Sequence, residues 1–245
     1  MFSISVTNGV AVPQHPQTLS GINRRRFLEN AAVAAVSGIA VPSLPTWGWS
    51  ERRELGPPLP PDGALEALLA GNRRFVANQL ISRQQDLSAL RHRTAEKQEP
   101  FAAVLACADS RVPVELLFDQ SIGQIFVTRV AGNIVTPELI ASLEYAVAVL
   151  GVRTVLVLGH THCGAVKAAM KTDTVPGQIS TLYQHIRPAV PLSGGDVEKA
   201  IVANARSQAD LLRTSSTVIR DTTAHGAISV SAAVYDLATG QVALI

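Results

Sequence analysis

Short apolar runs alternate with longer mixed stretches through the second part of the chain. Three runs are almost wholly apolar, as expected of strands covered on both faces of a sheet: FAAVLACA (101–108), QIFVTRVA (124–131) and RTVLVLGH (153–160). Between the last two, the stretch 137–151 predicts a helix that Pro137 starts and Gly151 ends. Strands that alternate with helices predict an α/β fold, with a mainly parallel central sheet flanked by helices.

Further helices are predicted on either side of these strands. A helix capped by Asp62 would run to about Leu80, and one side of it carries the apolar residues Leu65, Leu68, Leu69, Phe75 and Val76. A short helix of small residues is expected after Cys163, and other helices over 86–97, 178–187 and about 195–220. The last twenty residues predict a hairpin with its turn at Thr239-Gly240.

The first fifty residues have a different pattern. NRRRFLENAAVAAVSGIAVPSL places paired arginines and Phe-Leu before an uncharged stretch of small and apolar residues, and so resembles a twin-arginine export signal. An amphipathic helix of the mature protein is the alternative, but the alanine-valine stretch lacks a polar face. We expect an export signal over 1–50, a proline-rich linker over 51–62 and the folded domain over 63–245. The destination would be the periplasm, or the thylakoid lumen in a cyanobacterium.

The balance of charged residues limits the kinds of binding partner that the sequence predicts. The chain has 21 basic and 19 acidic residues; three arginines and one glutamate lie in the first fifty, which leaves 18 of each sign in the rest. This balance gives no electrostatic reason to expect nucleic acid or an anionic membrane as a partner. No run reaches the ~18 uninterrupted apolar residues of a spanning helix, so we expect no stable membrane insertion.

The two cysteines of the chain both lie near predicted strand ends. Cys107 closes the first strand, and His160 closes the third, three residues before Cys163. Functional groups gather beyond the carboxyl ends of parallel strands, and two thiolates with one imidazole are a ligand set of catalytic zinc. A helix beginning at Gly164 would place His160 and Cys163 on its first turn and lower the thiol pKa. His162 should point away from the site.

Asp109 and Arg111 follow Cys107 at alternate positions. Alternate residues of an extended segment point the same way, so Asp109 can face the fourth position of the metal. Arg111 is placed to hold that carboxylate ionised and oriented by a bidentate hydrogen bond, and the carboxylate would then direct a zinc-bound hydroxide. An exported protein could instead join its two cysteines in a disulfide, but a disulfide would explain neither His160 nor the Asp109–Arg111 pair.

C-x-D-x-R followed about fifty residues later by H-x-x-C closely resembles the β-class carbonic anhydrases, over roughly residues 63–245. The resemblance implies one Zn²⁺ per chain, held by Cys107, His160 and Cys163, whose hydroxide attacks carbon dioxide to give bicarbonate. Asp109, paired with Arg111, would direct that hydroxide. In some members the aspartate is itself a fourth zinc ligand in a closed resting state.

The same resemblance implies a pocket and a partner. Gln98, Phe126 and Tyr145 fall where the family has a substrate-orienting glutamine and two aromatic pocket residues. N-terminal helices would pack on a second subunit, giving a homodimer or a larger assembly with the pocket at the dimer interface. Two alternatives keep the same motif: a hydrolase of carbonyl sulfide or carbon disulfide, and a non-catalytic zinc-binding relative. Asp109 and Arg111 argue against the second, because a purely structural zinc site needs neither.

Overall fold

The computed structural model describes residues 59–171 and 173–245. The expected export signal (1–50) and most of the expected linker (51–62) lie outside the described residues. Pro61 and Asp62, which we assigned to the linker, form the first turn of helix α2 (Pro61–Val76). The predicted cap is therefore wrong: Pro60 is the N-cap and Pro61 the first helical residue, where the missing proline N–H costs no hydrogen bond.

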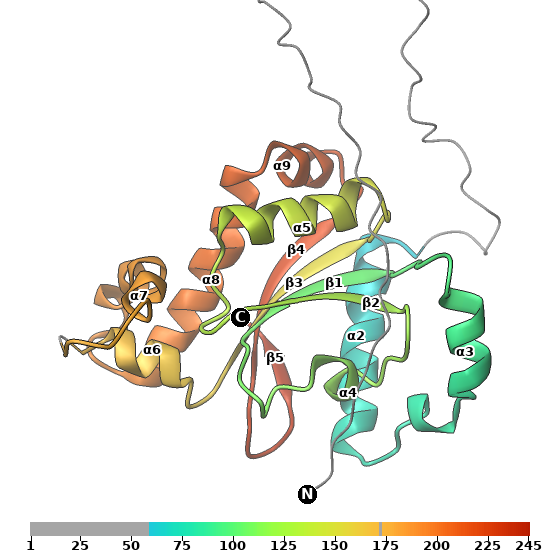
Figure 1. Ribbon diagram of the computed structural model, residues 1–245, viewed down its shortest axis with the longest axis horizontal. Coiled ribbons are helices and arrows are strands. Elements are labelled where there is room, and N and C mark those ends of the chain that lie inside the picture. The colour runs from blue at the N-terminus through green and yellow to red at the C-terminus, as the bar shows by residue number, and fades with distance from the viewer. Residues whose placement is uncertain (1–58, 172) are drawn as a thin grey trace, which may run out of the picture. The chain divides into compact units, whose positions relative to one another are not determined.

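A five-stranded sheet forms the centre of the fold (Figure 1). Its order is β2-β1-β3-β4-β5, and the strands are β1 (Ala102–Ala106), β2 (Ile125–Arg129), β3 (Thr154–His160), β4 (Ser229–Tyr235) and β5 (Val242–Leu244). The first four in this order are parallel, and β5 runs antiparallel to β4 as the predicted terminal hairpin. The expected α/β fold with a mainly parallel sheet is confirmed.

The position of each strand in the sheet explains its burial. Every residue of β1 and β3 is buried, as their apolar runs predict. In β2, which we also expected to be covered on both faces, only Thr128 is buried. That prediction is wrong because β2 is an edge strand, with a neighbour on one side alone.

Helices cover both faces of the sheet, and alternate residues of the central strands point to opposite faces. Ala103 and Val155 belong to a core shared with α5 (Pro137–Ala148), α8 (Val197–Ser215) and α9 (Thr217–Ala224). Ala102 and Leu156 belong to a second core, shared with α2 and α4 (Val114–Leu117). The remaining helices are α3 (Leu87–Thr94), α6 (Gly164–Ala169) and α7 (Ser180–Ile186), with short 3₁₀ turns η1 (Ser82–Gln84), η2 (Arg187–Ala189) and η3 (Pro191–Ser193).

The single long helix expected over 195–220 is divided at Ser216. This residue has an extended backbone (φ −99°, ψ 119°), so α8 ends before it and α9 begins after it. Its hydroxyl accepts from the N–H of Ile219 and donates to Glu144 of α5. Ser216 therefore caps α9 and ties it to the helix packed beside it.

Helix α2 lies very close to the backbone that follows α4. A Cβ atom on Gly71 would stand 1.8 Å from the carbonyl oxygen of Phe118, so only glycine permits this approach. The neighbouring Asn72 is buried and makes three hydrogen bonds, to the carbonyls of Leu117 and Gly240 and from the N–H of Val242. The close backbone approach at Gly71 and the hydrogen bonds of the Asn72 amide together hold α2 against the sheet.

Asp119 anchors the connection that follows α2. Its buried carboxylate accepts from the guanidinium of Arg74 at 2.5 Å and from the N–H groups of Ile81 and Ser82. Although burial by itself raises the pKa of Asp119, the hydrogen bonds from Ser82 and Arg74 bring this pKa below its ordinary value.

Among the helices of the described segments, none has the length and apolar character needed to cross a membrane.

Candidate metal centre

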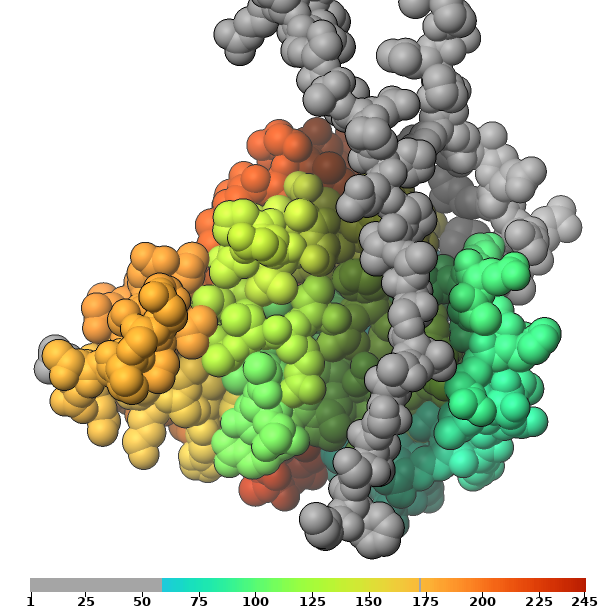
Figure 2. Space-filling model, in the orientation of Figure 1, coloured from blue at the N-terminus to red at the C-terminus, as the bar shows by residue number. Residues whose placement is uncertain are grey.

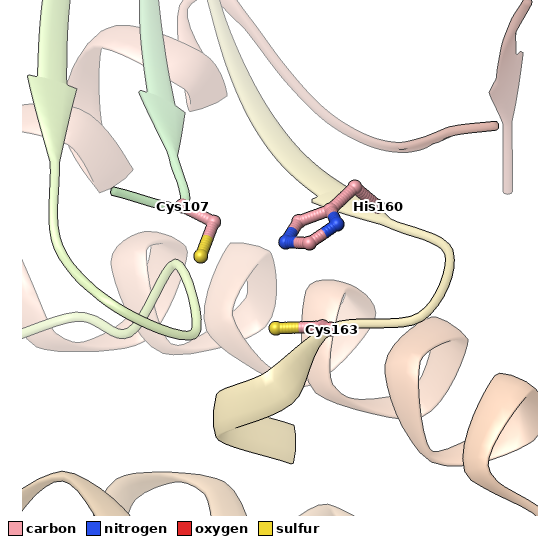
Figure 3. Close-up of side chains that lie close together, drawn as sticks. All are labelled: Cys107, His160 and Cys163. Carbon is pink, nitrogen blue, oxygen red and sulfur yellow. The ribbon is translucent and has the colours of Figure 1, made fainter. Parts of the chain in front are cut away.

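Three potential ligands meet at the carboxyl edge of the sheet. Cys107 directly follows β1, and His160 is the last residue of the adjacent parallel strand β3. Cys163 is the N-cap of α6, and its side chain turns back toward the other two (Figure 3). The expectation that His160 and Cys163 share a first helical turn is wrong, because His160 remains in the strand and a tight turn separates them, with His162 at φ 55°.

The candidate ligand atoms are close enough to share one ion. One ring nitrogen of His160 and the two sulfur atoms all lie within 4.8 Å of one another. The three residues are almost fully shielded from solvent, with exposed fractions of 3% for Cys107, 0% for His160 and 1% for Cys163. Both cysteines are free thiols, so the disulfide alternative is not what the structure contains.

The ring of His160 has a defined role for each nitrogen. Nδ1 lies 2.9 Å from the carbonyl oxygen of Thr161, and a carbonyl can only accept, so Nδ1 carries the proton. Nε2 then presents a lone pair, yet it is buried and has no hydrogen-bond partner. An unpartnered buried nitrogen beside two thiols fits a metal ligand, and this donor set suits zinc.

The two thiols differ in acidity. The pKa of Cys107 is lowered to about 4, first because the Cys163 thiol donates to its sulfur, and also because the N–H of Gly132 donates to it from 3.2 Å away. The pKa of Cys163 is raised, because it donates that hydrogen bond and is buried beside a negative sulfur. The N–H groups at the start of α6 act in the expected lowering direction but are outweighed.

Asp109 and Arg111 form the expected ion pair beside these ligands. The guanidinium donates from Nε at 2.9 Å and from one terminal nitrogen at 2.8 Å, and the backbone N–H of Arg111 adds a third bond at 2.9 Å. These bonds, the side-chain ones foremost, hold the pKa of Asp109 well below its usual range. One oxygen of this carboxylate lies 3.8 Å from Nε2 of His160, so the charge faces the ligand cluster.

Two further residues that the sequence reading did not single out support the site. Arg129, the last residue of β2, donates to the carbonyl oxygens of Cys107 at 3.0 Å and Asp109 at 2.6 Å. Gly132, three residues later, donates to the Cys107 sulfur. The available signal was their position: Arg129 lies near the end of the strand predicted over 124–131 and Gly132 directly follows it, at the same sheet edge as Cys107.

The three expected pocket residues lie away from the candidate ligands of the same chain. Phe126 pairs with Ala103 in the sheet, four residues before the level of Cys107, or roughly 13 Å along the strand. It packs against Tyr145 of α5, with ring centroids 6.5 Å apart. Gln98 is exposed in the loop before β1, and within the described residues no hydrogen bond joins it to the ligands. A single chain does not bring these three residues to the ligand cluster.

His162 points away from the candidate ligands, as expected. Its side chain is 76% exposed and lies 3.3 Å from the carboxylate of Glu198. That carboxylate also accepts from the backbone N–H of His162 at 3.1 Å, which holds the turn between β3 and α6.

The fold and the cluster define an α/β protein with a candidate two-cysteine, one-histidine metal site at the carboxyl edge of a parallel sheet. The carbonic anhydrase family profile matches residues 102–242. The chain is 35% identical over 194 residues to "Carbonic anhydrase 2" of Mycobacterium tuberculosis, an alignment covering 75% of this chain and 92% of that protein. It is 36% identical over 192 residues to a carbonic anhydrase of Mycolicibacterium smegmatis, covering 75% and 93%.

Solved structures agree with the sequence relatives. A Coccomyxa β-carbonic anhydrase in complex with acetazolamide superposes with a TM-score of 0.59 at 29% identity, covering 74% of this chain and 86% of that one. The chain therefore belongs to the carbonic anhydrase family, and within it to the β class. Membership supports an enzyme of carbonic anhydrase type.

Proposed function

We propose that this protein is a zinc-dependent carbonic anhydrase that interconverts carbon dioxide and bicarbonate. The observation that carries the proposal is the cluster of Cys107, His160 and Cys163 beside an ionised Asp109. Zinc bound there would supply a water acidic enough to become a nucleophile near neutral pH, less readily than with neutral ligands because two thiolates offset its charge.

The protein groups around the cluster have separable tasks. Asp109 accepts a hydrogen bond from the nucleophile and so fixes the direction in which its lone pair points. Arg111 keeps that acceptor ionised and oriented through its two side-chain bonds. Arg129 holds the backbone on either side of Ala108, so the carboxylate and the first cysteine keep a constant spacing. The aspartate could also move onto the metal in a closed resting state, since it already lies beside the histidine ligand.

The primary experiment is stopped-flow carbon dioxide hydration on protein whose zinc content is measured in the same sample. We expect one zinc per chain and fast hydration that rises toward alkaline pH. Cys163→Ser should lose both zinc and activity, whereas Asp109→Asn should keep zinc and lose most activity. Zinc without hydration would contradict the proposal; carbonyl sulfide and carbon disulfide would then be tested, and inactivity on these too would identify a non-catalytic zinc protein.

We also propose a homodimer or larger assembly whose interface completes the substrate pocket. Support comes from Phe126 and Tyr145, which pack together far from the ligands of their own chain. Tyr145 is 46% and Val149 57% exposed on or just after α5, which forms part of the surface in Figure 2. Analytical ultracentrifugation should show at least a dimer; a fully active monomer would contradict this assembly.

Export through the twin-arginine route remains part of the proposal. Its support is the sequence of residues 1–50 alone, with arginines at 24–26 and the uncharged stretch at 31–44. A reporter fused behind residue 50 should leave the cytoplasm only in bacteria with a working twin-arginine system. Retention of the reporter in such cells would refute the proposal.

A further inference from the structure

Two buried amides on α8 face the interior of the fold. Asn204 and Gln208 are four residues apart, on the same side of the helix, and are 0% and 2% exposed. The rest of that side consists of small and apolar residues: Ala200, Ile201, Ala205, Ala209 and Leu212. A buried amide costs about 1–3 kcal/mol if its hydrogen bonds are not made, so the partners of this pair indicate its purpose.

The partners lie mainly in the loop that follows β2. The oxygen of Gln208 accepts from the N–H of Val135 at 2.7 Å, and its nitrogen donates to the carbonyl of His185 at 3.0 Å and to the oxygen of Asn204 at 3.2 Å. The nitrogen of Asn204 donates to the carbonyl of Gly132 at 2.9 Å. The loop between β2 and α5 is thus held at Gly132 and at Val135 by two amides that also hydrogen-bond to each other.

The same loop carries the hydrogen bond to a candidate metal ligand. The N–H of Gly132 points at the sulfur of Cys107, 3.2 Å away, where the loop turns beside that side chain (Figure 3). Gly132 has φ +79°, and a Cβ atom on it would stand 2.7 Å from Cδ1 of Ile186. A glycine has wide backbone freedom, so the direction of its N–H depends on what holds the neighbouring backbone, here the amide of Asn204.

We propose that Asn204 and Gln208 are positioning residues of the metal centre, which fix the loop so that the N–H of Gly132 donates to the first cysteine ligand. This inference rests on the proposed metal centre. An N–H···S bond withdraws charge from a thiolate ligand. The sulfur then donates less electron density to the metal, so the metal remains a stronger Lewis acid. The same bond also holds the sulfur in the position needed for metal binding.

The test uses the full chain with its metal replaced by Co²⁺, because the cobalt–thiolate charge-transfer absorption reports charge on the sulfur. In Asn204→Ala the band should move to longer wavelength, because a sulfur without its hydrogen bond gives up an electron more easily. Affinity for zinc, measured by competition with a chelator, should fall about tenfold or more, because the loss of a fixed sulfur position outweighs the stronger donation from that sulfur. Gln208→Met, which keeps the volume but removes the amide, should change both quantities in the same direction.

Asn72→Ala is the matched control. Asn72 is also a buried amide with three hydrogen bonds, but it lies on α2 and joins Leu117, Gly240 and Val242. Its loss should lower the free energy of unfolding by an amount comparable to the α8 variants while leaving the cobalt band in place. If Asn204→Ala does not accumulate as folded protein, Asn204→Ser removes the same amide with a smaller loss of polarity.

The possible outcomes distinguish a failure of this inference from a failure of the proposed metal centre. A band unmoved in every folded α8 variant would show that the amides serve stability alone and would overturn the inference, with the metal centre intact. An equal shift in Asn72→Ala would overturn it too, because the shift would then follow from general destabilisation. A wild-type chain that takes up neither cobalt nor zinc would overturn the metal centre itself and this inference with it.

Discussion

Arg111→Met removes the side-chain half of the ion pair beside the candidate ligands. The two bonds that Asp109 would lose, 2.9 and 2.8 Å long, are charge-assisted and of a type that contributes about 1.5–3 kcal/mol each when shielded from water. The Arg111 side chain is 54% exposed, so solvent screens much of this contribution. We expect the loss of these orienting bonds to slow hydration by roughly one order of magnitude.

The pH dependence should change as well. The Arg111 side chain is the first cause of the lowered pKa of Asp109, so in the variant this pKa should rise toward its ordinary value. A carboxyl with a depressed folded-state pKa contributes stability above its ordinary pKa and loses this as the pH falls through the folded value. Wild-type protein should therefore keep an ionised Asp109 further into acid than the variant. At neutral pH both carry the charge, and the rate difference there reports orientation alone.

The assay is stopped-flow hydration from about pH 5 to about pH 9, with zinc content measured on each sample. Arg220→Met is the control, since Arg220 pairs with Asp221 on α9 and its side chain is equally exposed, at 54%. It should retain the wild-type rate. An Arg111→Met protein that keeps both zinc and the wild-type rate at every pH would refute the role given to this pair, as would an equal loss in Arg220→Met.

Three more predictions concern the two thiols, Gly71 of α2 and the buried Asp119. Zinc binding to metal-free protein near neutral pH should release about one proton, because the lowered pKa of Cys107 leaves it ionised and only Cys163 must lose its proton. Calorimetry in buffers of different ionisation enthalpy measures the number of protons released, and a value of two would contradict this prediction. Gly71→Ala should cost about 1–3 kcal/mol of unfolding free energy in urea, since α2 must move away from Phe118; an unchanged midpoint would contradict the close approach. Asp119→Asn should cost about 1–3 kcal/mol at neutral pH, and the difference from wild type should vanish as the pH falls through the lowered folded-state pKa of Asp119; a pH-independent difference would argue against an ionised carboxylate.

The ligand residues could be predicted from the sequence because their signals are local. A buried strand that ends in Cys107 and another that ends in His160 must place both at one edge if the strands are parallel, and the sheet register confirms this. The sign of the pKa shift at Cys163 could not be predicted in this way. It depends on which of two facing thiols ionises first, and this follows from the contact of Cys107 with Gly132.

Contacts between distant segments account for most of what the sequence did not reveal. Asn204 and Gln208 look like ordinary polar residues of a helix, and only the packing of α8 shows that they reach the loop after β2. The half-exposed state of β2 follows from its place at the sheet edge, which its apolar sequence does not encode. Phe126 and Tyr145 were expected in the substrate pocket. They pack together away from the ligands of their own chain, so they could line a pocket only beside the ligands of a second subunit.

The parallel pairing of β1 with β3 has a consequence for folding kinetics. Cys107 and His160 are about fifty residues apart in the chain, with helices α4 and α5 and the edge strand β2 between them, and they become neighbours only when β1 and β3 pair. Because this non-local pairing must form before the ligands can meet, we expect the three ligands to come together late in folding. A metal ion would therefore do little for the folding rate, and its binding energy would appear mainly as slower unfolding of the finished domain.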